Sequence, residues 1–187
     1  IGEALERLCG ERPGAAVYDL ARHFVAAGER QRGFRYALIA ADRAEKALAA
    51  SEAATYLTQA LAFLQPGDAL GGGGDLEMEL QYRLGRLLAL LGRLEEAEGA
   101  FRVALRIGQA RGDRQMQARI VLALASMHGR GGDWEGAITL GDRALALANE
   151  VGYHEGRADA LLSTGFFAFE QGDWHGAIDR LQQALQI

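Results

Sequence analysis

The chain has 187 residues, of which 49% are hydrophobic, so it can bury a sizeable core in one domain or one stretch of a repeat array. Its net charge of −5 gives no support for nucleic-acid binding by this segment. A single cysteine, Cys9, excludes an internal disulfide framework, and no apolar run reaches the ~18 residues that a membrane span needs.

The first third of the chain has the spacing of short helices separated by breakers. Apolar positions three and four apart predict helices over residues 2–9, 15–27, 30–48 and 52–64. Gly28 ends the second of these helices, and Ser51 is placed to cap the fourth. A Gly-rich loop is expected at residues 67–74; it lacks the Gly-Lys-Ser/Thr ending of a phosphate-binding loop.

The rest of the chain repeats with a period of 40 residues. Gly92, Gly132 and Gly172 share one register, and the last two open almost the same run of seven residues. A period in this range is typical of stacked helical hairpins. The glycine is expected to end the first helix of each hairpin at a positive φ. Asp133 and Asp173 follow as caps of the second helices.

Six helices follow from this register. First helices are predicted at residues 75–91, 114–129 and 154–170, and second helices at 94–110, 134–150 and 174–186. Nothing alternates with period two over a useful length, so strands are not expected. The sequence predicts an all-α fold, a right-handed α-solenoid of helical hairpins. It is expected to have an irregular leading segment at 1–66 and three repeats at 75–187.

The repeat columns resemble the tetratricopeptide repeat. The first copy carries the resemblance through Leu84-Gly85, Leu88, Gly92, Ala97, Phe101 and Ala104. The later copies depart from it, because Gly141 and Leu181 replace the aromatic residue at Phe101. The 40-residue period also exceeds the usual ~34. This longer form is similar to the repeats of large bacterial signalling ATPases of the maltose-regulator type.

Residues 1–65 carry a second resemblance. The runs Ile1–Leu8, Tyr18–Glu29, Tyr36–Ala41 and Tyr56–Leu61 look like the segment that follows the ATPase module in bacterial AAA or STAND-type regulators. Proteins of that kind often end in a LuxR-type DNA-binding domain or begin with a nucleotide cyclase domain. The resemblance implies a longer parent chain that senses a signal through its repeats. None of the ATPase residues lies in this fragment.

The candidate binding surface is the concave groove that first helices line in tetratricopeptide folds. Mapping the groove columns by the turn glycine gives nine residues: Glu79, Tyr82, Arg86, Arg119, Leu122, Ser126, Asp159, Leu162 and Phe166. Their mix of charged, aromatic and apolar groups suits a protein or peptide, or a small inducer. The Lys and Asn of the family's clamp for a C-terminal carboxylate are absent. The alternative is an ordinary solvated face with the ligand elsewhere.

No residue pattern in the chain predicts catalysis, a cofactor or a metal site. His23, His128, His154 and His175 are scattered, and no pair has the i, i+4 spacing of a zinc-binding helix. Trp134 and Trp174 follow the capping aspartates. They suit a stacking platform for a ligand, but the equivalent placement in two repeats favours covers for neighbouring helix ends.

Two functions remain open. The first is a non-catalytic interaction and sensor segment of a multidomain bacterial signalling or transcription regulator. The second is a free-standing scaffold or self-association module, which would stack through an open end at Ile187. The chain opens without a secretory signal, so a cytoplasmic location is expected. Only one of its 20 basic residues is lysine, and this bias indicates a bacterial genome of high G+C content.

Overall fold

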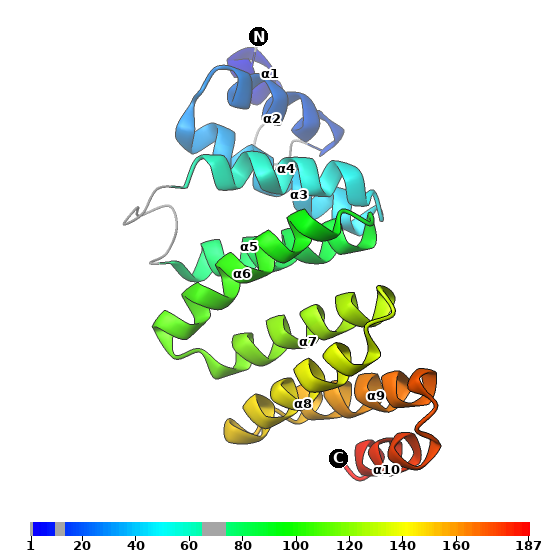
Figure 1. Ribbon diagram of the computed structural model, residues 1–187. Helices are drawn as coiled ribbons and strands as arrows, with labels where there is room; N and C mark the ends of the chain where they lie inside the picture. Colours follow the sequence, from blue (N-terminus) through cyan, green and yellow to red (C-terminus); the bar gives the residue numbers. More distant parts are fainter. Residues whose placement is uncertain (1, 10–13, 65–73) are drawn as a thin grey trace. The chain divides into compact units, whose positions relative to one another are not determined.

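The computed structural model describes residues 2–9, 14–64 and 74–187, so residues 67–73 of the expected Gly-rich loop lie outside the described residues. Regular structure in these ranges is helical, and the predicted all-α fold is confirmed (Figure 1). The helices are α1 (Gly2–Cys9), the short 3₁₀ turn η1 (Gly14–Ala16), α2 (Val17–Ala26), α3 (Arg30–Lys46), α4 (Ala50–Ala62), α5 (Asp75–Leu90), α6 (Leu94–Arg111), α7 (Arg114–Arg130), α8 (Trp134–Glu150), α9 (His154–Gln171) and α10 (Trp174–Ala184).

Most predicted helix ends fall within two residues of the observed ones, but the predicted cap at Ser51 is wrong. Helix α4 begins at Ala50, and the capping position belongs to Ala49, whose side chain makes no capping hydrogen bond. The amide of Ala53 donates to the carbonyl of Ala49 at 3.0 Å, which closes the first turn two residues earlier than the pattern suggested. Ser51 lies inside that turn, where its own carbonyl accepts a hydrogen bond from the Thr55 hydroxyl.

The turn glycines behave as the repeat predicts. Gly92, Gly132 and Gly172 have φ values of +75°, +82° and +92°. This left-handed conformation lets the amide of the following residue reach back to the first helix, as Asp173 does to the Ala168 carbonyl at 2.9 Å. A second set of turn glycines, Gly112 and Gly152, ends α6 and α8 in the same conformation and was missed from the sequence.

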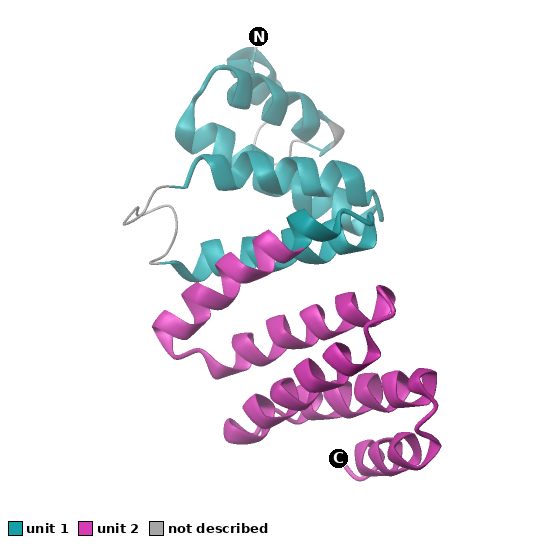
Figure 2. Cartoon of the chain, viewed as in Figure 1, with its two compact units in different colours: residues 1–97 teal, residues 98–187 magenta. Residues whose placement is uncertain are grey.

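The chain forms two compact units, residues 1–97 and 98–187, and the boundary falls within α6 (Figure 2). In the first unit, α3 packs against α2 and α4, and α4 packs against α5. Val17, Leu20 and Phe24 of α2 meet Tyr36 of α3 in its core, where the Phe24 and Tyr36 rings stack at 5.5 Å. The segment boundaries expected at 66 and 75 stay a prediction.

The second unit contains the part of α6 from Glu98 on and two hairpins, α7–α8 and α9–α10, and α9 also packs on α8 of the preceding hairpin. Small residues allow the close approach. Ala118 and Val121 of α7 share a core with Ala144 and Ala148 of α8 and with Ala160 of α9, and all five are buried. The first turns of α8 and α10 are capped by aspartate side chains. Asp133 accepts a hydrogen bond from the Gly136 amide at 3.0 Å, and Asp173 accepts one from the Gly176 amide at 2.9 Å. Both caps were predicted.

Candidate interaction surface

The nine predicted groove residues divide between the two units. Glu79, Tyr82 and Arg86 lie on α5 of the first unit, where Tyr82 is buried and the Arg86 guanidinium lies 5.8 Å from the centre of its ring. The other six lie on α7 and α9 of the second unit. Of the three residues on α5, Arg86 presents an exposed cation over the buried ring of Tyr82.

On α7 the predicted residues are engaged with their own unit. Leu122 is half-buried and packs against the cores that α8 and α9 share with α7. The Ser126 hydroxyl donates to the Leu122 carbonyl at 3.0 Å, and the Arg119 guanidinium lies 3.9 Å from the Met116 sulfur. The side chains of α7 thus contribute little free apolar surface.

On α9 the predicted residues are open to solvent. Leu162 and Phe166 are 49% and 53% exposed, and Asp159 one turn earlier is also exposed. The Phe166 ring packs edge-on against the buried ring of Phe167, with the ring centres 6.1 Å apart. Such a ring is held in place before any partner arrives, which lowers the entropy lost on binding.

Four residues that the sequence analysis did not assign to the groove extend this apolar surface. Phe169, Trp174, Ile178 and Leu181 are 47%, 57%, 54% and 39% exposed. The rings of Phe169 and Trp174 meet edge-on at 4.9 Å and join α9 to α10. We call the six residues Leu162, Phe166, Phe169, Trp174, Ile178 and Leu181 the α9–α10 face. Leu122, Trp134 and Ile138 of α7–α8 recur here as Leu162, Trp174 and Ile178, so the 40-residue register alone does not show which copy is exposed.

The two tryptophans differ in their surroundings. The Trp134 ring is half-buried, with its centre 6.3 Å from that of Phe167. It covers the helix that follows in the stack, as its equivalent placement suggested. Trp174 leans on Phe169 but keeps more than half of its surface exposed. The same motif position is therefore covered in one hairpin and open in the next.

His128 has a specific partner that its apolar column did not predict. Its Nδ1 lies 2.8 Å from Oδ2 of Asp133, the residue that caps α8 through its other oxygen. The hydrogen bond from His128, together with that from the Gly136 amide, lowers the pKa of Asp133 below its usual value. Among the described residues, no three His, Cys, Asp or Glu side chains gather as metal ligands would.

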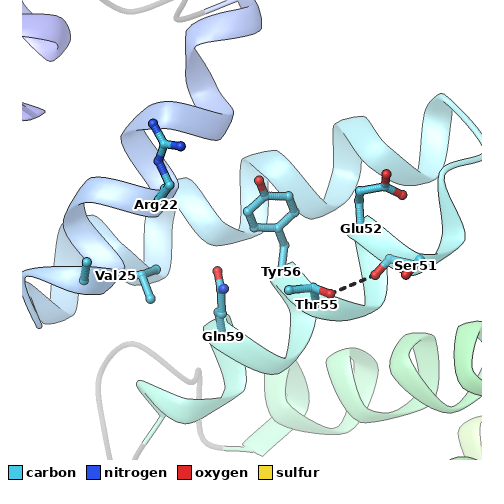
Figure 3. A pocket seen from close by; sticks show the side chains of 8 residues that line it. Arg22, Val25, Ser51, Glu52, Thr55, Tyr56 and Gln59 are labelled. Atoms are coloured by element: carbon cyan, nitrogen blue, oxygen red, sulfur yellow. Dashed lines mark hydrogen bonds between the residues drawn. The ribbon is translucent and has the colours of Figure 1, made fainter.

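A hollow of about 460 Å³, with polar and apolar lining residues, lies in the first unit between α2 and α4 (Figure 3). Arg22 and Tyr56 approach it from the two helices, and Arg22 is already paired with Asp19 at 2.9 Å. Burial raises the pKa of Tyr56, so its hydroxyl stays protonated at neutral pH. Gln59 Oε1 is buried without a hydrogen-bond donor among the described residues. No motif pointed to this hollow, because its two walls are far apart in sequence.

Comparisons with known proteins agree with this architecture. Residues 116–187 match the family model described as Tetratricopeptide repeat, which supports a tetratricopeptide repeat segment over this part of the chain. The crystal structure of BtubC (BKLC) from P. vanneervenii is similar, with a TM-score of 0.67 and 18% identity over 99% of this chain and 85% of that one. At that identity the likeness shows the fold, an α-solenoid of helical hairpins.

Two further findings complete the comparison. A search of curated proteins gives no match. Across residues 2–9, 14–64 and 74–187, none of the helices combines the length and apolar character that crossing a bilayer requires. Tetratricopeptide repeats generally mediate protein–protein interactions and are typically non-catalytic.

Proposed function

We propose that the second unit binds a protein partner through the exposed face of α9, and that the chain is a non-catalytic interaction and sensor segment. The observation that carries this proposal is the exposure of Leu162 and Phe166 beside the free carboxylate of Asp159. Scattered apolar residues are common on surfaces, but contiguous ones mark interaction sites. Aromatic rings are also enriched among the residues that dominate binding energy.

The wider context of the proposal is a multidomain bacterial signalling or transcription regulator. It rests on the resemblance of residues 1–65 to the segment after the ATPase module of such regulators. In that setting, occupancy of the repeats would bias the packing of neighbouring hairpins and so report the signal. Sequencing the reading frame on both sides tests this part directly. A Gly-x-x-x-x-Gly-Lys-Ser/Thr loop upstream supports it, and a frame of repeats alone contradicts it.

Peptide display against the purified chain tests the binding proposal. Selected peptides should bind the native chain and lose at least about tenfold in affinity against Phe166→Ser, which removes a ring that is 53% exposed. Leu48→Ser is the matched control, because Leu48 is 91% exposed but lies in the first unit. Peptides that bind all three proteins equally would contradict the proposed surface.

A self-association module is the second candidate, and one observation favours it. The exposed residues Trp174, Ile178, Leu181 and Leu185 of the α10 segment recur at spacings of four, three and four, which places them on one stripe. Sedimentation velocity at high protein concentration separates the two candidates. A monomer favours a foreign partner, and a dimer that Ile178→Ser dissociates favours self-association.

A further inference from the structure

The hollow between α2 and α4 of the first unit is large enough for a small organic molecule. Its volume of about 460 Å³ falls within the range of about 300–1,000 Å³ that is usual for ligand pockets. Val25 and Ala26 of α2 and the half-buried Tyr56 of α4 supply apolar surface on its two walls. The hollow belongs to the first unit, whereas the proposed protein-binding surface on α9 belongs to the second.

The two walls of the hollow carry opposite charges. Arg22 comes from α2 and Glu52 from α4, and both side chains are exposed (Figure 3). Among the residues that the structure describes, Glu52 has no ion-pair partner, and Arg22 pairs only with Asp19, at 2.9 Å. That pair is 72% and 55% exposed, and exposed pairs contribute little to stability. Arg22 can therefore turn to a ligand at small cost.

Tyr56 lies near both charges. Its ring packs against the ring of Tyr18, with the ring centres 5.7 Å apart. Burial is the main cause of the raised pKa of Tyr56, and smaller electrostatic effects of Arg22 and Glu52 on this pKa place both charges near the hydroxyl. The hydroxyl stays protonated at neutral pH and makes no hydrogen bond with a described residue. It is therefore available to donate to an anionic group of a ligand.

Gln59 supplies the observation that points to a bound molecule. Its Oε1 is buried, yet it has no hydrogen-bond donor in the part of the chain that the structure describes. A buried acceptor without a donor is unfavourable, and most buried polar atoms in folded proteins are hydrogen-bonded. Glu52, Tyr56 and Gln59 are spaced four and three residues apart, so they follow one face of α4 along the hollow. A ligand that lies along this face can donate an N–H group to Gln59.

We propose that the hollow between α2 and α4 binds a small zwitterion of amino-acid or dipeptide size. The ammonium group of the ligand pairs with Glu52, and its carboxylate pairs with Arg22 and accepts a hydrogen bond from Tyr56. An N–H group donates to Gln59 Oε1, and an apolar side chain packs against Val25. A ligand with only one charge leaves one wall unmatched, so a zwitterion is selected over a simple anion or cation.

An NMR titration of the full ¹⁵N-labelled chain tests this site, because the side-chain amide of Gln59 reports on it directly. The probes are free leucine and the dipeptide alanyl-leucine, each compared with its N-acetyl form, which lacks the ammonium, and its C-terminal amide, which lacks the carboxylate. At least one zwitterion should shift the Gln59 signals with a dissociation constant on the order of 1 mM. Its N-acetyl and amide forms should bind at least about fivefold more weakly.

Variants assign each charge of the ligand to its wall. Glu52→Gln should remove the preference for the zwitterion over the N-acetyl form, and Arg22→Gln should remove the preference over the amide. Glu95→Gln and Arg43→Gln are the matched controls, because both side chains are exposed in the first unit and neither lines the hollow. Both preferences should survive in the controls. Gln59→Leu should weaken binding of the zwitterion by about fivefold, since it removes the acceptor.

The outcomes separate this inference from the proposed function. If neither zwitterion shifts Gln59 at about 20 mM, or if the zwitterions and their modified forms bind equally, the inference is overturned and the surface on α9 is unaffected. If the zwitterion binds but no displayed peptide depends on Phe166, the proposed function fails and the inference stands. Phe166→Ser should leave zwitterion binding unchanged. A circular dichroism melt of each variant checks that the fold persists.

Discussion

The α7–α8 and α9–α10 hairpins share one register and differ in what covers them. In α7–α8, Gly129 and Gly141 lie directly under side chains of α9. Their equivalents in α9–α10, Phe169 and Leu181, are 47% and 39% exposed. The repeat therefore keeps the hairpin and changes these two positions. The hairpin that α9 covers has glycine at these two positions, and α9–α10 has large apolar residues there. The size of the residue at each position therefore goes with whether a helix packs closely on it.

The largest difference in the free energy of unfolding is expected between two variants that each truncate one of the adjacent phenylalanines of α9. Phe167→Ala removes a ring that is 6% exposed and should lower the free energy of unfolding by about 3–5 kcal/mol. Phe166→Ala removes a ring that is 53% exposed and should change it by at most about 0.5 kcal/mol. Urea denaturation measures both, and equal losses would mean that the two faces of α9 are not distinguished as described.

The next largest loss of stability is expected from placing a side chain at Gly141, where α9 packs closely. Gly141→Leu copies Leu181 into the covered hairpin, where its Cβ would meet Thr164, and should cost about 1–3 kcal/mol through overpacking. The matched control is Gly99→Leu, since Gly99 lies within α6 with open space around its Cβ position. Replacing that glycine should stabilise the helix by a few tenths of a kcal/mol or more. An unchanged free energy of unfolding in Gly141→Leu would contradict the claim that α9 leaves no room for a side chain at this position.

The two capping aspartates, Asp133 and Asp173, should contribute different amounts to the free energy of unfolding. Asp173→Ala loses one capping hydrogen bond and should cost about 1 kcal/mol. Asp133→Ala should cost more, because Asp133 also holds His128 at 2.8 Å, whereas the equivalent of His128 in the next hairpin is Ala168. Thermal melts of the two variants at neutral pH compare them. A larger loss for Asp173→Ala would contradict the pairing.

The same pair predicts a dependence on pH with a definite sign. The pKa of Asp133 is lowered in the folded state, so its contribution is present above its unfolded pKa of about 3.9 and is lost as pH falls through the folded value. His128→Ala should raise the pKa of Asp133 toward its usual value. A carboxyl-detected NMR titration of Asp133 measures the change. An unmoved Asp133 would show that His128 does not cause the shift.

The smallest expected effect concerns a turn without glycine. Leu48 ends the α3–α4 turn at φ +57°, where the repeat hairpins use glycine, and its side chain is 91% exposed. Leu48→Gly should relieve the backbone strain and raise the free energy of unfolding by about 0.5–1 kcal/mol. The control is Gly172→Leu, which should destabilise. A loss of stability in Leu48→Gly would show that the leucine side chain contributes more than its exposure suggests.

Local signals in the sequence predicted the fold well. The turn glycines and the caps Asp133 and Asp173 depend only on nearby backbone, so their spacing was enough. The Ser51 cap was wrong because the α3–α4 turn places Leu48 in a left-handed conformation that its residue type disfavours, and α4 begins earlier.

The candidate surface was predictable only in part. Asp159, Leu162 and Phe166 followed from the groove columns, and the structure finds all three exposed. Exposure of Trp174 and Ile178 depends on which helix covers them, and the periodic pattern is the same for covered and open copies. The hollow between α2 and α4 joins residues from two helices without a shared motif, so no spacing could reveal it.

The accessibility of the two tryptophans tests the central comparison most directly. Trp134 and Trp174 are the only tryptophans, so Trp134→Phe and Trp174→Phe each leave a single reporter. Acrylamide quenching should be strong and emission red-shifted when only Trp174 remains, and both should be weaker when only Trp134 remains. Equal quenching of the two, or a protected Trp174, would contradict the account of a half-buried Trp134 in α7–α8 and an exposed Trp174 in α9–α10.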